Sequence, residues 1–307
     1  MDQASQRHSA APSWSTAAVP TRGAAPDATR MDTVELLVSD LDAMTEFYRR
    51  AVTLDVLDQS GATATLGRGG VAAIVLRHEK GLPGRDSRGA GLYHTAIVFQ
   101  DQARLASALA SMAQHAGQLY EGSADHLVSE AFYFHDPEGN GLELYRDRPR
   151  DQWTVHADGT VQMASEFLDP NQFLQRWYDP EAKEEGTDAT AAIGHVHLQV
   201  GDIPTARRFY EGVLGFDVTA SLGSALFLSA GGYHHHIGMN TWHSAGAGPR
   251  AATLGLGDVR IVGPTRDDVE AFGERVRDHG IAAEDDGRTL RLADPWGTRL
   301  AITSEGA

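Results

Sequence analysis

Two histidines and one glutamate combine residue types and positions suited to binding a metal ion. His94 and His195 lie in the apolar segments GLYHTAIV and GHVHLQV, and Glu143 lies in the apolar segment GLELY. Burying a carboxylate in such a segment is costly unless a hydrogen-bond donor or a cation pairs with it. Two imidazoles and one carboxylate form the triad that leaves positions on an iron(II) ion open to oxygen and substrate. A single histidine on a strand is more often structural. The predicted metal site therefore depends on all three residues lying at equivalent positions of the internal repeat described below.

The run GGYHHHIG, residues 231–238, is a second candidate for chemistry. Three consecutive histidines in a strand alternate faces, which would point His235 away from His234 and His236. Imidazoles exchange protons near neutral pH, so His235 is a candidate acid/base, and its two neighbours are candidate substrate-binding groups. The alternative is an exposed polar strand edge.

The segment 122–141 (GSADHLVSEAFYFHDPEGNG) brings further polar residues toward Glu143. Its hairpin pattern would place His126 and Tyr133 near the metal, with catalytic roles, although Tyr133 could instead be a core aromatic. His197, two residues after His195, shares its strand face and is a candidate substrate contact. Three nearby polar residues could orient these groups, namely Asp125, Ser129 and Glu130. Asp136 and Asp294 are predicted to be turn residues and not catalysts.

An internal repeat organises the chain. VELLVSDLDAMTEFYRRAVTLDVL begins at Val34 and VHLQVGDIPTARRFYEGVLGFDVT begins at Val196, and eight residues of the first segment recur 162 positions later. Alternating apolar residues predict a strand, and the aspartate that follows is suited to capping a helix. DPEGNGLELY and DPWGTRLAIT repeat a turn that leads into a last strand. Helices are expected over 102–115 and 266–279.

These repeats predict an α+β protein of four βαβββ modules that form two cup-shaped mixed sheets. The first 30 residues are expected to be a disordered tail, with a transit peptide as the alternative. The predicted units are modules 1 (31–80) and 2 (90–147) in a first domain over 31–147, a connector over 148–191, and modules 3 (192–243) and 4 (252–305) in a second domain over 192–307.

Composition excludes several classes of function. The formal charge of -16 argues against nucleic acid or an anionic membrane as partner, because both need basic surface. The 307 residues include no cysteine, which excludes disulfides, thiolate catalysis and cysteine-based metal sites. No apolar run approaches the ~20 residues of a membrane helix. A cytoplasmic protein with a small-molecule partner is expected, and homo-oligomerisation stays open.

The motifs resemble those of the vicinal oxygen chelate superfamily, and most closely its two-domain catechol 2,3-dioxygenase-like (type I extradiol) proteins. The most specific match is SADHLVSEAFYFHDPEGNGLELYRDRPRDQW, and GGYHHHIGMNTW and IGHVHLQVGDIPTARRFY also match. The resemblance implies an iron(II) site formed by His94, Glu143 and His195. It also implies His235 as acid/base, with His126 and Tyr133 beside the substrate.

The order of the ligands differs from the usual extradiol arrangement, in which modules 3 and 4 carry them. Here modules 2 and 3 carry the ligands, so these two modules must face each other. Modules 1 and 4 would then form a metal-free pair, since their equivalent positions hold Thr33, Asp258 and Ala301.

The leading hypothesis is therefore an Fe(II)-dependent ring-cleaving dioxygenase acting on a catechol-like or hydroquinone-like aromatic and O2, with Mn(II) as the alternative metal. A lyase or isomerase using another divalent metal is the second hypothesis. A binding or resistance protein that holds a small molecule without turnover is the third.

Overall fold

The computed structural model describes residues 24–180 and 190–306, and within them it has the predicted α+β architecture. Four modules follow one another, each a strand, a helix and three further strands. Their elements are β1 (Arg30–Val38), α1 (Leu41–Arg50), β2 (Asp55–Ser60), β3 (Thr63–Arg68) and β4 (Val71–His78) in module 1; β5 (Gly91–Phe99), α2 (Gln102–Ala116), β6 (Tyr120–Asp125), β7 (Ser129–His135) and β8 (Gly141–Asp147) in module 2; β9 (Ala191–Gln199), α4 (Ile203–Arg207), the π-helical η3 (Arg208–Val213), β10 (Asp217–Leu222), β11 (Ala225–Ser229) and β12 (Ile237–Asn240) in module 3; and β13 (Gly255–Gly263), α5 (Arg266–Asp278), β14 (Ala283–Asp285), β15 (Thr289–Ala293) and β16 (Arg299–Ser304) in module 4.

The modules pair across the two halves of the chain. β5 of module 2 runs antiparallel to β9 of module 3, and β1 of module 1 runs antiparallel to β13 of module 4. One half-sheet therefore has the order β6-β7-β8-β5-β9-β12-β11-β10, and the other has the order β14-β15-β16-β13-β1-β4-β3-β2. A single residue pair, Arg68 with Ala191, joins β3 to β9 between them. This is the pairing of modules 2 and 3 that the ligand distribution requires.

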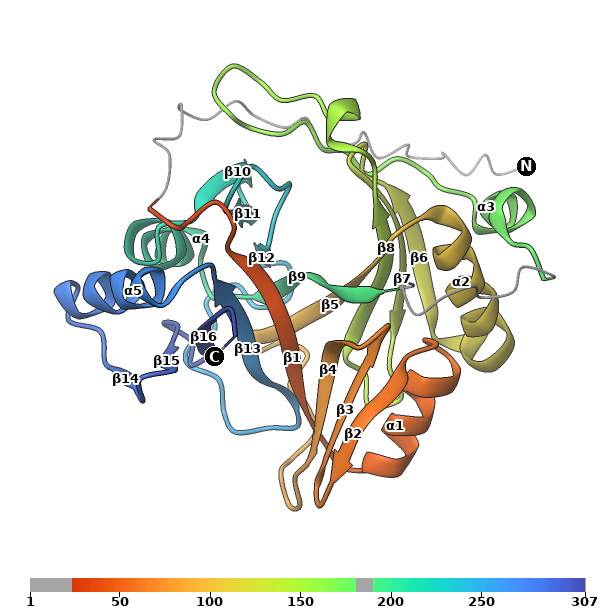
Figure 1. Ribbon diagram of the computed structural model, residues 1–307, viewed down its shortest axis with the longest axis horizontal. Helices are drawn as coiled ribbons and strands as arrows, with labels where there is room; N and C mark the ends of the chain where they lie inside the picture. The colour runs from red at the N-terminus through yellow and green to blue at the C-terminus, as the bar shows by residue number, and fades with distance from the viewer. Residues whose placement is uncertain (1–23, 181–189, 307) are drawn as a thin grey trace, which may run out of the picture.

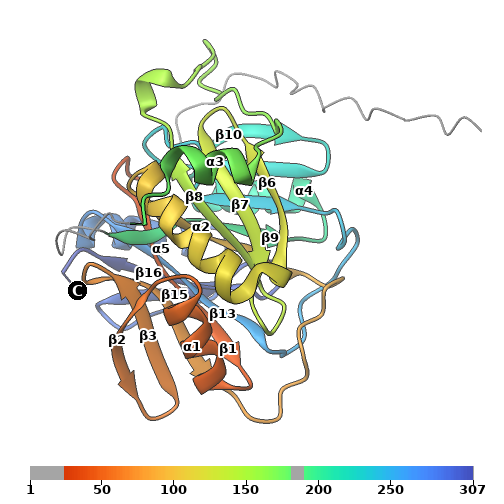
Figure 2. The same cartoon turned by 90° about the vertical axis from the view of Figure 1, so that its right-hand side faces the viewer.

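Helices cover the outer faces of these strands. α1 and α2 lie on one side of the molecule, and α4 and α5 lie on the opposite side (Figures 1 and 2). The predicted caps form, because the carboxylate of Asp40 accepts from Ala43 N–H and that of Asp202 accepts from Thr205 N–H. The helices expected over 102–115 and 266–279 match α2 and α5 to within one residue.

The repeated Phe-Tyr and Asp-Pro motifs tie neighbouring modules together. Tyr48 O–H on α1 donates to Asp136 in the turn before β8, and Tyr210 O–H on η3 donates to Asp294 in the turn before β16. Each aspartate also accepts backbone N–H groups of its own turn. Burial raises the pKa of both aspartates and both tyrosines. The two aspartates are therefore structural turn residues.

The structure refines the expected tail and connector. Of the predicted tail, residues 1–23 lie outside the described residues, but Ala25 is buried, its N–H donates to Gly215 O, and β1 begins at Arg30. The connector includes η2 (Arg150–Gln152) and α3 (Pro170–Trp177), and its residues 181–189 are likewise not described. Its side chains Trp153, Val161 and Met163 pack against Phe227 of β11. The connector thus covers the concave face of the half-sheet formed by modules 2 and 3.

Candidate functional site

The candidate metal ligands lie in one row across the half-sheet of modules 2 and 3. Ala96 of β5 is opposite Glu143 of β8 on one side and opposite His195 of β9 on the other. Tyr133 of β7 extends the row, because it is opposite Glu143. His94, two residues before Ala96, shares its strand face. The small side chain of Ala96 therefore lies between the larger polar groups.

Irregularities in the strands bring more side chains to this face. The register of β5 against β9 shifts between Leu92 and His94, so Tyr93 and His94 both contribute to the site. A second shift bulges β9 at Gly194, directly before His195. A Cβ atom at Gly194 would lie 1.7 Å from the hydroxyl of the buried Tyr145. Only glycine fits at that position.

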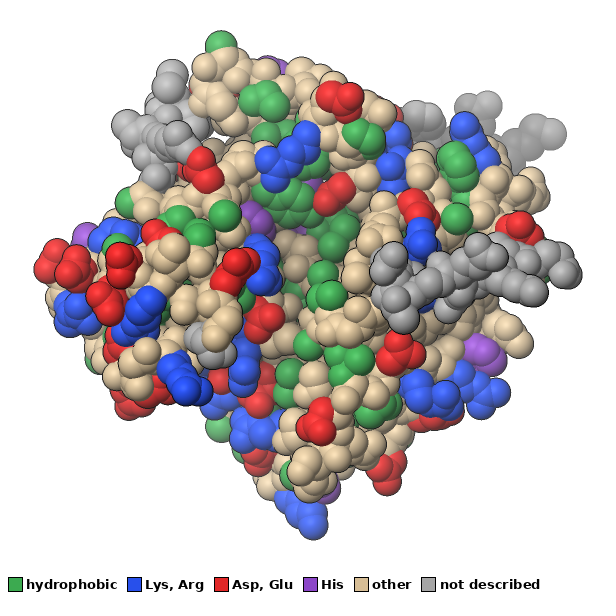
Figure 3. All heavy atoms as spheres, viewed as in Figure 1, with side chains coloured by type: hydrophobic (Ala, Val, Ile, Leu, Met, Phe, Trp, Pro, Cys, Tyr) green, Lys and Arg blue, Asp and Glu red, His purple; other side chains and the backbone are tan. Residues whose placement is uncertain are grey.

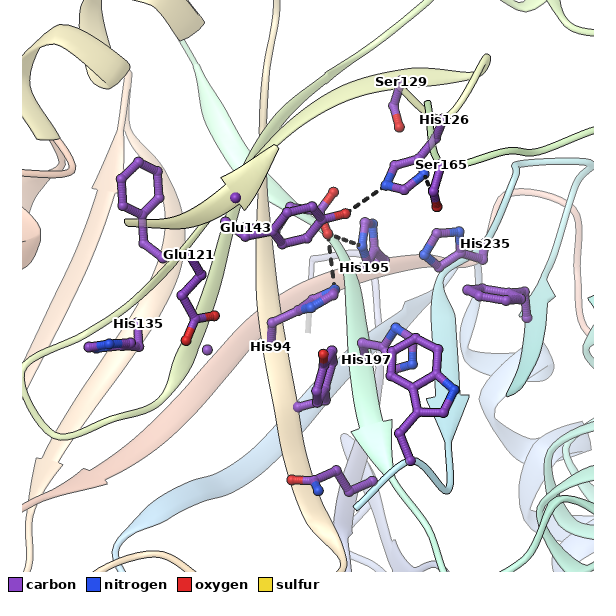
Figure 4. Close-up of a pocket in the computed structure, with 18 of the residues that line it drawn as sticks. His94, Glu121, His126, Ser129, His135, Glu143, Ser165, His195, His197 and His235 are labelled. Atoms are coloured by element: carbon purple, nitrogen blue, oxygen red, sulfur yellow. Dashed lines mark hydrogen bonds and ion pairs between the residues drawn. The ribbon is translucent and has the colours of Figure 1, made fainter. Parts of the chain in front are cut away.

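The three ligand atoms converge. His94 Nε2 lies 3.0 Å from Glu143 Oε2, and His195 Nε2 lies 3.1 Å from the same oxygen (Figure 4). One ligand atom from each residue lies within 4.8 Å of the other two, and all three side chains are buried. Two ligands at right angles on a metal with bonds of about 2.1 Å would be about 3 Å apart. The spacing therefore fits one divalent ion.

Hydrogen bonding within the protein does not satisfy this cluster. His94 Nε2 and His195 Nδ1 are buried without a hydrogen-bond partner among the described residues. A buried imidazole nitrogen without a partner is costly, unless something else binds it. His94 Nε2 already faces the carboxylate oxygen of Glu143, so an ion held between them would satisfy both groups.

The protonation states also suit a metal. Burial lowers the pKa of His195 to about 4, against the attraction of Glu143. Burial opposes the charged form of Glu143, but the neighbouring His195 and His94 outweigh it and hold the pKa of that carboxyl well below its usual range. Near neutral pH, His195 is therefore neutral and Glu143 is an anion, the forms that bind metals.

His126 and Tyr133 form a hydrogen-bonded pair beside the ligands. His126 Nδ1 lies 2.6 Å from the carbonyl oxygen of Ala164 in the connector, so this nitrogen is the donor. Its Nε2, 2.6 Å from Tyr133 Oη, therefore accepts from the tyrosine hydroxyl. Burial, together with the charge of Glu143, raises the pKa of Tyr133 well above its usual value. Tyr133 is thus a neutral hydroxyl whose position is set by His126 and, through it, by the connector.

The three consecutive histidines do not lie in a strand, so the predicted alternation of faces is wrong. Gly231 and Gly232 have φ of 61° and 67° and turn the chain before β12 begins at Ile237. All three histidines are buried, which also excludes the exposed strand edge.

Two of these histidines lie at the site. His235 has its ring 4.1 Å from that of His195, centroid to centroid, and lines the pocket. His234 also lines the pocket; its Nδ1 is 2.8 Å from Nδ1 of His235, and its Nε2 is 2.8 Å from Asp147 Oδ1.

His236 is placed away from the candidate site. Its Nδ1 accepts from Ala230 N–H, and its ring packs on Tyr233 at 4.9 Å. The pocket lining does not include it. The prediction that His236 contacts substrate is corrected, because the irregular segment turns its ring toward Tyr233 instead.

His197 lies opposite His94 on β9 and lines the pocket. Asn240 Nδ2 donates to His197 Nε2 at 2.9 Å, which leaves Nδ1 as the protonated nitrogen of the neutral ring. Burial lowers the pKa of His197 well below its usual value. The structure therefore places a neutral imidazole next to the ligands.

The three candidate ligands line one pocket of about 730 Å³, together with His126, Tyr133, His197, His234 and His235. The face drawn in Figure 3 is hollowed near its centre, and hydrophobic side chains gather there. The pocket lining also includes residues that were not predicted: Tyr93 and Glu121 lie at bulges, Met163 in the connector, Phe227 on β11 and Trp242 after β12. Trp242 lies in the motif GGYHHHIGMNTW, but nothing in its spacing indicated that its side chain lines the pocket.

The equivalent positions in modules 1 and 4 hold ion pairs instead of a ligand triad. Asp258 pairs with Arg299, and Glu35 pairs with both Arg299 and Arg77. Thr33 and Ala301 are buried. Arginine cations occupy the polar part of this second face, so it does not resemble a metal site.

Similarity to known proteins agrees with this geometry. The family model described as the Glyoxalase/Bleomycin resistance protein/Dioxygenase superfamily matches residues 30–144 and 192–302. The chain belongs to this superfamily. The resemblance found in the sequence motifs is therefore confirmed, and so is the predicted fold class.

One relative matches nearly the whole chain. A protein of Bacillus subtilis (strain 168) named catechol-2,3-dioxygenase is 35% identical over 274 residues, which cover 87% of this chain and 94% of the relative. That relative is an oxidoreductase by its name.

Solved structures share the fold at lower identity. A candidate dioxygenase from Bacillus subtilis subsp. subtilis str. 168 has a TM-score of 0.62 at 14% identity, covering 92% of this chain and 87% of its own. Glyoxalase I from Zea mays has a TM-score of 0.54 at 17% identity, covering 90% of this chain and 92% of its own. Among the described residues, no helix has the length and apolar character needed to cross a membrane.

Proposed function

We propose that this superfamily member is an iron(II)-dependent extradiol-type dioxygenase that opens the ring of a catechol-like or hydroquinone-like aromatic with O2. The observation that carries the proposal is the convergence of His94, Glu143 and His195 at 3.0–3.1 Å in a buried pocket. The relative named catechol-2,3-dioxygenase supports the same class of reaction.

His94, Glu143 and His195 would hold the ion. Bound there, iron(II) would supply open positions for substrate oxygens and O2, and a positive charge opposite developing anions. Manganese(II) accepts the same nitrogen and oxygen ligands and is the alternative metal.

His235 is the proposed acid/base. Burial lowers the pKa of His235 well below its usual value, so its imidazole is neutral at pH 7 and can accept a proton from a substrate hydroxyl. Its hydrogen-bonding neighbour is His234, whose other nitrogen contacts Asp147. This contact fixes the orientation of the two rings.

Tyr133 is proposed to donate a hydrogen bond to substrate oxygen, and His126 keeps its hydroxyl in place. Phe227 and Trp242 line the pocket near His197 and exclude water from the ring-binding space.

The test is oxygen uptake after anaerobic loading with iron(II), measured with a panel of catechols and hydroquinones. We expect uptake that needs both iron and diol and yields a ring-opened product absorbing in the near ultraviolet or visible range. His94→Ala should lose both the metal and the activity. If no diol supports uptake and His94→Ala retains its full metal content, the proposal is wrong.

The same experiment separates the other two functions. A lyase or isomerase using a divalent metal would convert its substrate without consuming O2. A binding protein would hold an aromatic ligand equally well with and without metal, whereas the proposed enzyme should bind diols more tightly when iron is present.

A further inference from the structure

A β-bulge turns Glu121 toward the pocket. In the β6–β7 ladder, Tyr120 pairs with Phe134 and Gly122 pairs with Tyr133, so Glu121 is the extra residue between them. The hydroxyl groups of Tyr120 and Ser123 lie 2.8 Å apart, which shows that these two side chains share the opposite face. Regular alternation would have placed Glu121 on that opposite face as well. With the bulge, Glu121 and Gly122 both line the pocket, and Figure 4 shows the Glu121 side chain among the lining residues.

The carboxylate of Glu121 interacts electrostatically with Arg85. It forms no hydrogen bond or ion pair with the residues that the structure describes, and its side chain is exposed at the pocket mouth. Its charge nevertheless reaches the interior. Burial and, to a smaller extent, the charge of Glu121 raise the pKa of Tyr93, whose ring lies 5.4 Å from that of His94 and 5.2 Å from that of His197.

The charge of Glu121 interacts with that of one arginine in the described lining of the pocket. The one arginine there, Arg85, donates to the carbonyl oxygens of Gly139 and Leu92. A carboxylate on a ligand would therefore compete with Glu121 for the charge of Arg85.

The pocket also has room beyond a single ring. Its volume of about 730 Å³ lies within the range of sites that hold drug-sized molecules, which are several times larger than catechol. Apolar side chains supply part of the additional wall, including those of Val128, Met163 and Leu222. A ring substituent can thus be accommodated, and its charge is what Glu121 would sense.

Resting on the proposed function, we propose that Glu121 is a specificity-determining residue that selects catechols with a neutral or ammonium-bearing side chain and disfavours those with a carboxylate. The formal charge of -16 acts in the same direction on encounter with an anionic substrate. Because Glu121 is exposed, solvent and salt screen its effect but do not cancel it.

Three diols of similar size test the proposal: 4-(2-aminoethyl)catechol, 4-ethylcatechol and 3,4-dihydroxyphenylacetate. At low ionic strength the iron-loaded protein should show kcat/KM at least about tenfold higher for the amine than for the acid, with 4-ethylcatechol between them. Glu121→Gln should reduce this ratio by about fivefold or more, and Glu121→Lys should invert it. Raising the ionic strength should reduce the ratio in the wild-type protein, because salt screens an exposed charge.

Glu274→Gln is the matched control. Glu274 is an exposed carboxylate on α5 of module 4, so this substitution changes the net charge equally without touching the pocket. Its amine-to-acid ratio should stay within twofold of the wild-type value. A fall as large as that of Glu121→Gln would show that net charge, and not Glu121, sets the preference, and would overturn the proposal.

Ligand binding separates failure of this inference from failure of the proposed function. Dissociation constants of the same three diols are measured anaerobically on the iron-loaded protein, where turnover is not needed. If ring opening occurs but Glu121→Gln leaves the amine-to-acid ratios of kcat/KM and of affinity unchanged, the proposed role of Glu121 is wrong and the proposed dioxygenase activity is supported. If no diol is turned over but the binding ratio still responds to Glu121→Gln and Glu121→Lys as expected, the charge selection stands and the reaction is wrong.

Discussion

Gly141→Ala should separate the two strands that carry His94 and Glu143. Gly141 lies opposite His94 in the parallel β5–β8 ladder, two residues before Glu143. A Cβ atom at this position would lie 2.0 Å from the carbonyl oxygen of Tyr93 and 3.0 Å from Cβ of His94. The oxygen belongs to the backbone and cannot rotate away. Ordinary contact begins near 3.4 Å, so the strands must part by about 1.4 Å.

That displacement is large compared with the tolerance of a metal site. Ligand bonds of about 2.0–2.2 Å tolerate changes of about 0.2 Å. We therefore expect Gly141→Ala to weaken metal binding by more than about 100-fold, beyond the 10–100-fold typical for loss of a group that orients a ligand. Overpacking should also lower the free energy of unfolding by about 1–3 kcal/mol.

The assay is an anaerobic iron(II) titration against a competing chelator, together with urea unfolding of the metal-free protein. Gly122→Ala is the control, because Gly122 also lines the pocket but a Cβ there meets nothing within 4 Å. It should bind iron within twofold of the wild type. A folded Gly141→Ala protein with equally unchanged affinity would refute the reasoning that the β5–β8 register positions the ligands.

Two further predictions concern Tyr133 and the buried histidines. Tyr133→Phe removes the hydroxyl that His126 positions, so kcat for diol-dependent oxygen uptake should fall about tenfold or more with the iron content unchanged; loss of iron would instead indicate a structural role. Burial lowers the pKa of His236 from 6.5 to about 3. Below pH 6.5 the unfolded chain therefore takes up a proton that the folded protein excludes, and the folded protein becomes less stable as the pH decreases. Between pH 7 and 5 this histidine should cost the metal-free protein about 2 kcal/mol in the free energy of unfolding. His236→Asn should flatten that part of the slope in urea titrations, and an unchanged slope would contradict the assigned burial.

Much of the architecture could be predicted because the sequence contains an internal repeat and the periodic apolar patterns of strands and helices. The repeat from Val34 to Val196, the helix caps and the equivalent positions of the three ligand residues are all local features of sequence. They also imply which modules must face each other, since only one pairing brings His94 and Glu143 to His195. The observed β5–β9 ladder is that pairing.

The remainder depends on departures from periodicity. Strand alternation wrongly extended through His234–His236, because two glycines with positive φ turn the chain there. The bulges at Tyr93 and Glu121 bring side chains to the pocket that regular alternation places elsewhere. Met163 reaches the pocket from the connector, whose position is set by packing against module 3. A single sequence carries no local signal for these contacts.

Metal stoichiometry tests the central claim most directly. We predict about one iron(II) per chain in the wild-type protein after anaerobic loading and desalting, and almost none in His94→Ala, Glu143→Gln or His195→Ala. Asp258→Asn, at the position in module 4 equivalent to His94, should retain the full content. Iron retained by the three ligand variants, or lost in Asp258→Asn with the fold intact, would contradict a single site between modules 2 and 3.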